Sequence, residues 1–420
     1  MTERIRATYL IETASELERA AAEMAGEQSS GTFVAVPGET PELKARSGAV
    51  VEHIEPLAQH ETAHSPSLPG ARQPRTGEPY RRAVVELSWP LDNLGPSLPN
   101  LMATVAGNLF ELHAFSGLKI LDIALPEAFA EANPGPGFGI DGTRQLTGVD
   151  DRPLIGTIIK PSVGLDPEAT ASLVDELCTA EIDFIKDDEL QCDGPHCPFG
   201  QRVEAVMNIV NRHADRTGKK VMVAFNLTGE IDEMRARHDL VLAKGGTCVM
   251  ASLNSVGITG LLGLRRHSQL PIHAHRNGWG ALSRHPLLGF SYVAWAKFWR
   301  LAGADHMHVN GIRNKFCEPD ESVIAAARAC LTPMFETKPC TVMPVFSSGQ
   351  SAKQVHDTYA ALCATDLIYC CGGGVMAHPD GVEGGVASLR QAWEAAVAGI
   401  PLEDHARGHP ALQAALDTYR

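Results

Sequence analysis

The chain has 420 residues, of which 36 are Lys or Arg and 50 are Asp or Glu, so its formal net charge is −14. A negative field of this size repels nucleic-acid phosphates and anionic lipids, so we expect neither a nucleic acid nor a membrane as partner. Hydrophobic residues make up 44% and charged residues 20%, which excludes extensive disorder. No apolar run reaches the about 18 residues of a spanning helix. The N-terminal segment also lacks the pattern of a secretory signal, so we expect a cytoplasmic protein.

The ten cysteines are scattered, mostly in apolar segments, which predicts buried free thiols rather than a disulfide framework. Cys192 and Cys197 are close enough in sequence to suggest part of a zinc site. No second Cys or His pair follows them at the spacing of a zinc finger, however, which argues against this interpretation.

The first third of the chain predicts an α+β domain. Alternating or continuous apolar residues predict strands at 5–11, 49–54, 82–88 and 119–124. Apolar residues at helical spacing predict helices at 15–24, after a Ser cap, and at 98–112. Residues 56–80 are rich in Pro, Gly, Ser and His and predict an exposed loop. The Pro- and Gly-rich segment 133–139 predicts a linker, so we expect an N-terminal domain over 1–138 and a second domain over 139–420.

After this linker, eight short apolar runs each precede a helical pattern, which is typical of parallel βα units. The runs are 154–159, 182–186, 221–226, 247–252, 272–276, 306–309, 342–347 and 367–371. Eight such units fit a (β/α)8 TIM barrel. An open doubly wound sheet could show a similar rhythm, but no Gly-x-Gly-x-x-Gly follows the first run.

Reactive residues of such a barrel lie at the carboxyl ends of its strands. The second run ends in Lys186-Asp187-Asp188-Glu189. Strand alternation predicts that Lys186 and Asp188 point to the same side, with Glu189 in the following loop. Two carboxylates suit Mg²⁺, and a lysine beside that ion makes sense if its pKa is lowered and CO2 converts it into a carbamate, a third anionic oxygen ligand. The alternative is a solvated run of charges on a loop.

Histidines follow two later runs. His273, His275, His306 and His308 could form a zinc set, or could be hydrogen-bonded parts of the barrel. We expect His275 and His308 to contact the substrate, because their near-neutral pKa would suit a proton relay. Arg276 could clamp a phosphate or carboxylate with two hydrogen bonds.

Glycine-containing segments follow the last two runs, at 347–349 and 372–374. The loops at these places usually hold phosphate in TIM barrels, through backbone N–H groups that glycine leaves accessible. Lys160 ends the first run, and Lys315 lies in a Gly-led loop that could act as a mobile lid. Each lysine alone would be interpreted as a surface residue. Together with a hard cation and two histidines, they suit the formation and stabilisation of an enediolate.

These motifs together resemble those of the RuBisCO large subunit, over residues 27–390. The segment 156–165 is similar to the strand-one motif, with Lys160 as its catalytic lysine, and 183–189 is similar to the carbamylated-lysine motif. The resemblance implies that Lys186, Asp188 and Glu189 hold Mg²⁺, with CO2 bound as the carbamate of Lys186.

The same resemblance implies roles for further residues. His275, Arg276 and His308 would contact the substrate, and Lys315 matches the loop-six lysine of the family. The implied substrate- and phosphate-binding residues include Ser347, Gly349, Gly372 and Gly373 in the barrel, and Glu27, Thr32 and Asn108 in the first domain. The family contributes segments like those of the first domain across a dimer interface. We therefore expect an N-terminal ferredoxin-like α+β domain, a C-terminal barrel, and a homodimer with shared active sites or a higher homo-oligomer.

Several positions depart from the family pattern. Ser162 stands where the family has a second lysine, Trp279 where a histidine is expected, and Phe33 where a tryptophan is expected. A histidine expected after the fourth run is also replaced, near Ala251 and Ser252. These changes remove charge that true carboxylases use, so the chain is identified as a RuBisCO-like protein of the form IV type.

The resemblance implies an Mg²⁺-dependent enzyme that forms a metal-stabilised enolate from a phosphorylated keto sugar or 3-oxo sugar acid. A retained Lys315 favours a substrate that carries a carboxylate, hence a decarboxylase-type lyase. One alternative is a tautomerase or isomerase of methylthio-sugar phosphates. Others are a genuine ribulose-bisphosphate carboxylase and a non-catalytic, redox-responsive regulatory protein.

Overall fold

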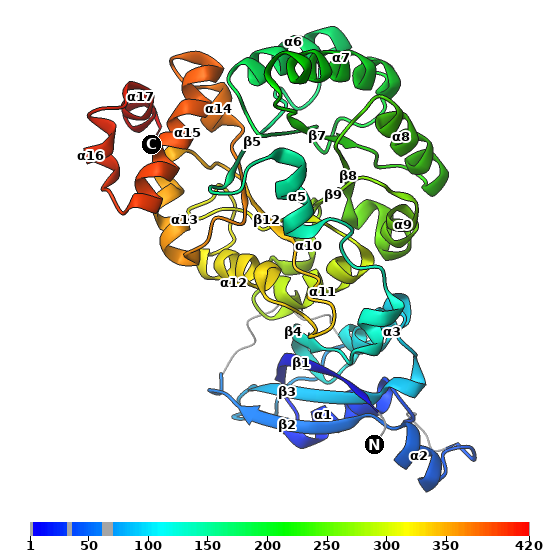
Figure 1. Ribbon diagram of the computed structural model, residues 1–420. Coiled ribbons are helices and arrows are strands. Elements are labelled where there is room, and N and C mark those ends of the chain that lie inside the picture. The colour runs from blue at the N-terminus through cyan, green and yellow to red at the C-terminus, as the bar shows by residue number, and fades with distance from the viewer. Residues whose placement is uncertain (1–2, 32–35, 61–69, 420) are drawn as a thin grey trace. The chain divides into compact units, whose positions relative to one another are not determined.

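The computed structural model describes residues 3–31, 36–60 and 70–419, which form two compact units (Figure 1). One unit comprises Met1–Asn133 together with Gly278–Leu301, and the other comprises Pro134–Asn277 together with Ala302–Arg420. The segment 278–301 thus belongs to the first unit although its neighbours along the chain belong to the second. The expected division into an N-terminal domain over 1–138 and a barrel domain over 139–420 stays a prediction.

The first unit is built on a five-stranded sheet in the order β10-β4-β1-β3-β2. Its strands are β1 (Arg4–Thr13), β2 (Val50–Pro56), β3 (Arg81–Pro90), β4 (Phe115–Ala124) and β10 (Leu288–Phe290). β1 pairs antiparallel with β3 and β4, and β2 pairs antiparallel with β3. Helix α1 (Leu17–Glu27) joins β1 to β2, and α3 (Leu98–Val105) lies between β3 and β4. This order and connectivity confirm the expected ferredoxin-like domain.

Two local expectations for this unit are wrong, and one strand was not predicted. Helix α1 is capped by Glu16, with no side-chain hydrogen bond, because the hydroxyl of Ser15 instead accepts a bond from Arg72. The helix expected over 98–112 ends at Val105, and Gly107, which follows with a φ of 36°, leads into a separate 3-10 turn, η2 (Leu109–Glu111). Strand β10 was not predicted, since its three residues become a strand only by pairing parallel with β4.

The first unit contains further short elements around its sheet. They are α2 (Pro41–Ser47), η1 (Leu91–Asn93), α4 (Ala128–Ala132), α10 (Gly280–Ser283) and α11 (Tyr292–Ala302), whose last residue belongs to the second unit. Aromatic side chains of this inserted segment form a cluster of their own, in which the ring of Trp295 lies 4.9 Å from that of Trp279 and 5.3 Å from that of Trp299.

The second unit is a closed barrel of eight parallel strands, in the order β11-β12-β13-β5-β6-β7-β8-β9. They are β5 (Leu154–Ile158), β6 (Phe184–Lys186), β7 (Met222–Asn226), β8 (Cys248–Ser252), β9 (Ile272–His275), β11 (His306–His308), β12 (Met343–Phe346) and β13 (Ile368–Cys370). Every strand lies within one of the eight predicted runs, which confirms the TIM barrel and excludes the doubly wound sheet. Leu154, Phe184, Met222, Met250 and Val345 belong to the apolar core of the barrel.

Most helices of this unit form a ring around the barrel, while α5 crosses one end of it and α16 and α17 pack on the outer side of α15 (Figure 1). They are α5 (Gly139–Thr147), α6 (Pro167–Thr179), α7 (Phe199–Thr217), α8 (Ile231–Ala243), α9 (Leu253–His267), α12 (Asp320–Leu331), η3 (Ala352–Gln354), α13 (Val355–Leu362), α14 (Gly373–Met376), α15 (Gly381–Ala398), α16 (Leu402–Ala406) and α17 (Pro410–Thr418).

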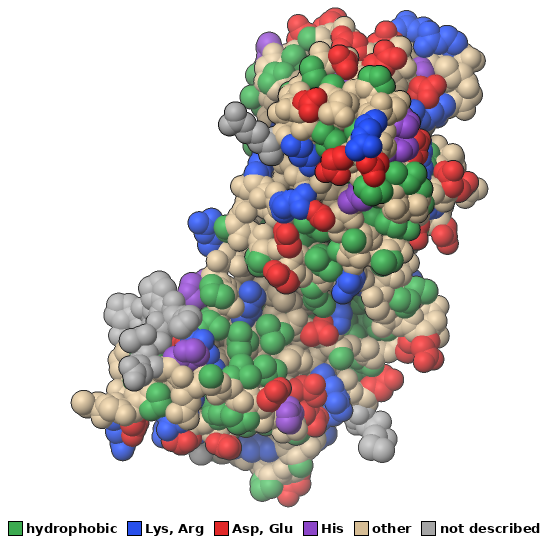
Figure 2. Space-filling model, turned by 90° about the vertical axis from the view of Figure 1, so that its left-hand side faces the viewer, with side chains coloured by type: hydrophobic (Ala, Val, Ile, Leu, Met, Phe, Trp, Pro, Cys, Tyr) green, Lys and Arg blue, Asp and Glu red, His purple; other side chains and the backbone are tan. Residues whose placement is uncertain are grey.

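Two predictions from composition can be compared with the structure. All ten cysteines are free thiols and most are buried, as expected. Within the described ranges, no helix combines the length and the apolar character needed to cross a membrane. Figure 2 shows acidic side chains interspersed with basic ones over the face in view.

A buried carboxylate fixes the amino end of the barrel where β5 and β6 begin. Asp183 is fully buried and accepts hydrogen bonds from Arg152 (2.5 and 3.1 Å), from Lys219 (2.7 Å) and from the backbone N–H of Ile155 (2.9 Å). Burial alone would raise the pKa of Asp183, but the two cations outweigh it and lower this pKa below its ordinary value. The ionised carboxylate therefore stabilises the folded state.

We expect Asp183→Asn to lower the free energy of unfolding by about 2 kcal/mol near neutral pH, because it leaves two partly buried cations without their counter-ion. A pKa lowered by folding stabilises the native state above the unfolded-state pKa of about 3.9, and this stabilisation is lost as the pH falls further. The difference between wild type and variant should therefore shrink in acid. Urea denaturation at several pH values measures it.

The matched control for this prediction is Asp175→Asn. Asp175 forms an exposed pair with Arg212 at 3.8 Å, so its loss should change stability by less than about 0.5 kcal/mol. An Asp183 variant as stable as this control at pH 7 would contradict the role assigned to the buried carboxylate.

Candidate active site

The carboxyl ends of the parallel strands bring the predicted site residues of the barrel to one rim. Lys160 lies after β5, Lys186 ends β6, His275 ends β9 and His308 ends β11. In a closed barrel these ends face a shared space, which is where TIM-barrel enzymes bind substrate. Residues separated by about 150 positions along the chain therefore meet because strand pairing, not sequence proximity, sets their distance.

Lys186 is fully buried at this rim. Its Nζ donates a hydrogen bond of 2.7 Å to the carbonyl oxygen of Asp187 and lies 3.7 Å from a carboxylate oxygen of Glu189. Burial lowers the pKa of Lys186, although the nearby carboxylates oppose this shift. A lowered pKa favours the neutral amine, the form of a lysine that reacts with CO2.

Two carboxylates accompany this amine. Asp188 is buried and accepts a 2.6 Å bond from Nζ of Lys160. Burial would raise the pKa of Asp188, but the bond from Lys160 and other interactions lower it. The Glu189 side chain is 31% exposed, and its Oε2 lies 3.5 Å from Nε2 of His275. The alternative of a solvated charge run is wrong, because Lys186 and Asp188 are both enclosed.

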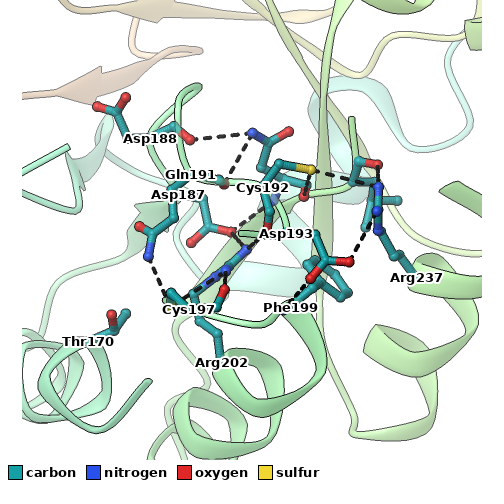
Figure 3. Close-up of polar contacts among 12 residues, drawn as sticks. Thr170, Asp187, Asp188, Gln191, Cys192, Asp193, Cys197, Phe199, Arg202 and Arg237 are labelled. Carbon is teal, nitrogen blue, oxygen red and sulfur yellow. Dashed lines mark hydrogen bonds and ion pairs between the residues drawn. The ribbon is translucent and has the colours of Figure 1, made fainter. Parts of the chain in front are cut away.

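Residues of β7 and α7 hold the loop that carries the two carboxylates in place through hydrogen bonds (Figure 3). Asp187 accepts bonds from Arg202 (3.1 Å) and from the backbone N–H of Asn226 (2.9 Å), so its carboxylate is used in this support. The amide Nδ2 of Asn226 donates to three loop carbonyls, those of Asp188 (3.4 Å), Glu189 (3.3 Å) and Gln191 (3.2 Å).

Sequence reasoning gave no role to these supporting residues. In the sequence, Asn226 is only an amide at the end of an apolar run. Arg202 lies within a helix and belongs to no motif that would indicate a role in the site. The same loop explains the two cysteines considered for zinc. The thiol of Cys192 lies 2.7 Å from the carbonyl oxygen of Thr228, and that of Cys197 accepts a bond from Gln191, so both belong to the local hydrogen-bond network.

The histidines at the rim are joined to one another. Nε2 of His308 lies 2.8 Å from Nε2 of His273, and its Nδ1 lies 3.0 Å from the hydroxyl of Ser347. The ring of His275 lies 4.5 Å from that of His308. His306 instead bonds the hydroxyl of Thr143 at 2.8 Å, inside the barrel, which fits the interpretation of a structural histidine and not a four-histidine zinc set.

The protonation of these histidines differs from the sequence-based expectation of near-neutral pKa values. Burial, together with the charge of Lys186, lowers the pKa of His275 to about 4. Burial also lowers the pKa of His308 well below its ordinary value. Both rings are therefore neutral at pH 7 and can donate and accept hydrogen bonds without adding positive charge to the site.

Arg276 is buried and forms an ion pair with the carboxylate of Glu318. Glu318 also accepts a 2.6 Å bond from the side-chain amide of Asn310. The guanidinium is thus oriented by an acid from the loop after β11, an acid that sequence reasoning missed. In the same loop, the backbone N–H of Lys315 donates to the carbonyl of Ser348 at 3.2 Å, and its side chain is exposed.

The residues expected to hold phosphate lie near these lysines. Ser347 is buried beside His308, and Gly349 has a φ of 84°, a conformation that favours glycine. A Cβ at Gly349 would lie 3.4 Å from Cβ of Lys315, and one at Gly372 would lie 3.7 Å from Cε of Lys160. Gly373 is exposed and begins α14.

The site residues expected in the first unit are partly brought together. Glu27 is exposed at the end of α1, and Asn108 is exposed before η2. Their neighbours Gln28 and Gly107 are in direct contact, because a Cβ at Gly107 would lie 2.4 Å from the amide of Gln28. Thr32 and Phe33 lie outside the described residues.

The donor set around Lys186 fits the metal and the modification expected there. Mg²⁺ prefers oxygen ligands and is usually held by one or two carboxylates while it keeps several water ligands. Asp188 and Glu189 supply two carboxylates at a buried amine with a lowered pKa, and a carbamate on Lys186 would add a third oxygen donor. A closed parallel barrel with reactive side chains at the carboxyl ends of its strands is the arrangement of TIM-barrel enzymes, and this protein has it.

Comparison with known proteins gives the family. The sequence matches the ribulose bisphosphate carboxylase large chain, N-terminal domain over residues 3–129 and catalytic domain over residues 139–419. The chain belongs to this family. Its relatives include a 3-oxo-isoapionate-4-phosphate transcarboxylase/hydrolase of Xanthobacter autotrophicus, 59% identical over the whole of both chains. A 3-oxo-isoapionate-4-phosphate decarboxylase of Rhizobium etli is 46% identical over 98% of each chain.

Solved structures agree. A rubisco-like protein from Burkholderia fungorum is 47% identical, with a TM-score of 0.92 over 99% of this chain and 100% of that one. An octameric ribulose-1,5-bisphosphate carboxylase/oxygenase from Pyrococcus horikoshii is 31% identical, with a TM-score of 0.85 over 99% and 94%. The resemblance to RuBisCO is confirmed, and the greater similarity to RuBisCO-like enzymes than to this carboxylase supports the identification as a RuBisCO-like enzyme.

We expect Asn226→Asp to weaken activation by Mg²⁺ about 10- to 100-fold, because a carboxylate cannot donate to the three carbonyls of the loop that carries Asp188 and Glu189. The KM for the substrate at saturating Mg²⁺ should change much less. Asn211→Asp is the matched control, since the amide of Asn211 donates to the carbonyl of Lys244 outside the site. Equal Mg²⁺ activation of both variants would show that Asn226 does not support the loop.

Proposed function

We propose that this protein breaks the carbon–carbon bond to the carboxylate of a phosphorylated 3-oxo sugar acid, of the 3-oxo-isoapionate-4-phosphate type. The observation that carries this proposal is the 59% identity, over the whole chain, with a transcarboxylase/hydrolase named for that substrate. Decarboxylases named for the same substrate are 46% identical. Their shared substrate supports the sequence-based expectation of a carboxylate-bearing substrate over a methylthio-sugar phosphate.

The chemistry of such a substrate matches the rim. A carboxylate placed β to a ketone leaves as CO2 when the electrons of the broken bond pass to the ketone oxygen, which gives an enolate. When bound, Mg²⁺ supplies an electrophile that stabilises negative charge developing on this oxygen. Carbamylated Lys186, Asp188 and Glu189 would hold this ion, and metal binding is the one role that the proposal gives them.

The remaining residues would bind and orient the substrate. The ammonium of Lys160, which is 40% exposed, is held at 2.6 Å from Asp188 and can direct an N–H towards the developing enolate. The neutral rings of His275 and His308 would orient substrate hydroxyl groups. Lys315 would bind the departing carboxylate, Arg276 would contribute to anion binding, and Ser347, Gly349, Gly372 and Gly373 would hold the phosphate.

The fate of CO2 separates two versions of this activity. In a decarboxylase, CO2 leaves and a proton from the enzyme or from solvent takes its place. In a transcarboxylase/hydrolase, a proton shift would first make a different carbon of the enolate nucleophilic, and CO2 would form its new bond to that carbon. Water would then add to the adjacent ketone and cleave the bond between the two carbons, which gives two carboxylic acids. The relative with 59% identity is a transcarboxylase/hydrolase, which favours that version. The relatives named as decarboxylases have a lower identity, 46%, so the decarboxylase is the second candidate.

The direct test uses 3-oxo-isoapionate 4-phosphate labelled with ¹³C in its carboxylate, with Mg²⁺ and bicarbonate present. We expect two carboxylic acid products, one of which keeps the label, followed by ¹³C NMR. Release of one labelled CO2 per substrate, with one solvent deuteron incorporated in D2O, would identify a decarboxylase instead. No consumption of this substrate, together with isomerisation of a methylthio-sugar phosphate, would refute the proposal.

A second prediction concerns Lys186. Lys186→Met keeps the length of the side chain but cannot form a carbamate, so we expect turnover to fall at least about 100-fold. Activation of the wild type by preincubation with bicarbonate and Mg²⁺ should be absent from the variant. Lys244→Met, at a surface pair with Glu204, is the control and should keep both properties. Full activity of the Lys186 variant would defeat the carbamate.

We further propose a homodimer in the cytoplasm in which Glu27, Thr32 and Asn108 complete the active site of the partner. The exposure of Glu27 and Asn108 supports this arrangement. Solved relatives are described as an octameric enzyme from Pyrococcus horikoshii and a dimeric one from Hyperthermus butylicus, 29% identical to this chain, so a higher homo-oligomer is the alternative.

A further inference from the structure

A second group of potential metal ligands lies among the last helices of the second unit, where α13, α15, α16 and α17 lie side by side (Figure 1). Glu394 on α15, His405 on α16 and His409 at the start of α17 each place a ligand atom within 4.8 Å of the other two. Oε2 of Glu394 lies 4.0 Å from Nε2 of His405. The rings of His405 and His409 stack with their centroids 3.8 Å apart.

The hydrogen bonds of the histidines fix which ring nitrogen carries a proton. Nδ1 of His409 lies 2.7 Å from the carbonyl oxygen of His405, and a carbonyl can only accept, so Nδ1 is protonated and Nε2 keeps its lone pair. By the same argument, Nε2 of His356 on α13 donates to the carbonyl of Ile400 at 2.8 Å, and its Nδ1 keeps the lone pair. Histidines that bind metals usually have their second nitrogen held in this way.

Two nitrogens of this group have no visible partner. Nε2 of His405 and Nδ1 of His356 are buried, and neither has a hydrogen-bond partner among the described residues. A buried polar atom without a partner costs about 1–3 kcal/mol, so such atoms call for an explanation, and a bound ion is one. His356 lies on α13, which packs against α15, and its bond to Ile400 places it beside the segment that leads into α16.

A second cluster of similar composition shows the contrast. His238 and His267 both bond the same carboxylate oxygen of Asp239, at 2.9 and 2.6 Å, and Nε2 of His238 accepts a bond from the backbone N–H of Gln269. The lone pair of His238 is therefore already used. This cluster is satisfied by its own hydrogen bonds, whereas the cluster around His405 is not.

We propose that Glu394, His405 and His409, with His356 as fourth ligand, form a structural Zn²⁺ site that ties α16 and α17 to α13 and α15. Three imidazoles and one carboxylate suit Zn²⁺, which is bound tetrahedrally in structural sites, and they do not suit Mg²⁺. Zn–N bonds are about 2.0–2.1 Å long, so binding requires the ligand atoms to move closer together and the stacked rings of His405 and His409 to turn until both lone pairs face the ion.

This site would support the C-terminal segment of the chain. Helix α17 leads to Tyr419, whose hydroxyl donates to the carbonyl of Gly374 at 3.1 Å. Gly374 follows the glycines to which phosphate binding is assigned above. The proposed ion would therefore stabilise a segment that reaches the phosphate-binding region without being part of the catalytic site, and the zinc proposal does not depend on the proposed reaction.

The test is Zn²⁺ binding by the full-length protein. Protein stripped with chelator and kept reduced is titrated with Zn²⁺ in excess Mg²⁺, which occupies the oxygen-rich site. We expect the wild type to bind one more tight Zn²⁺ than His405→Gln/His409→Gln, by calorimetry and elemental analysis. Zn²⁺ should also raise the Tm of the wild type and not that of the double variant, because a ligand of the native state stabilises it.

His267→Gln is the matched control, since it removes a histidine from the satisfied cluster and should keep the full Zn²⁺ stoichiometry. Co²⁺ bound to the wild type should show the visible absorption of a tetrahedral ion without thiolate charge-transfer bands, which separates this site from the cysteines. If the double variant does not fold, Glu394→Gln, whose carboxylate is largely exposed, should weaken Zn²⁺ binding at least tenfold. Equal Zn²⁺ stoichiometry and affinity in wild type and variants would overturn the proposal.

Discussion

The active-site assignment depends on one buried amine. Lys186 is enclosed at the end of β6, where its Nζ donates to a backbone carbonyl and lies 3.7 Å from Glu189, but burial outweighs the nearby carboxylates and lowers the pKa of the amine. An isolated buried charge is costly, so the group either loses its proton or acquires a partner. Reaction with CO2 does both, because it consumes the neutral amine and replaces a cation by an anion that a divalent metal can balance. The instability of the free lysine is thus the physical basis of the proposed cofactor site.

The barrel makes this arrangement possible by holding the loop after β6 rigidly. Asp187 and Arg202 form a buried pair beneath the loop, and Asn226 holds its carbonyls from the neighbouring strand. The carboxylate of Asp187 and the amide of Asn226 are thus bonded to protein atoms, which leaves Asp188, paired with Lys160, and Glu189, 3.7 Å from Nζ of Lys186, as the acids of the proposed site. One acid of the Asp-Asp-Glu run therefore supports the loop while the two others are available for a ligand, a division that their order in the sequence does not reveal.

The sequence predicted the barrel well because parallel strands are buried on both faces and so appear as continuous apolar runs. It failed where structure arises from distant contacts. The three residues of β10 pair with β4 from a segment more than 150 positions away. A local cause was missed as well, since the helix expected over 98–112 stops before a glycine turn that its apolar spacing conceals. The same limit applies to the site. Strand ends located Lys186 and His275, but the ion pair of Arg276 with Glu318 joins two loops and has no signature along the chain.

Two of the departures from the carboxylase pattern, Ser162 and Trp279, have structural explanations. Ser162 accepts a 2.7 Å bond from Lys160, so the position that carries a second lysine in the family pattern here supports the first. Trp279 is buried in the first unit, with its ring 5.5 Å from that of Tyr292 and 4.9 Å from that of Trp295. A position where the family pattern has a histidine is therefore used for packing. The chain keeps Lys160 and the two acids of the proposed metal site, while it lacks the second lysine and a histidine of the family pattern. On the proposed mechanism, an enzyme altered in this way would retain the means to stabilise an enolate and would lose groups that direct what is added to it, which is the change expected when one barrel comes to catalyse a different reaction on a related substrate.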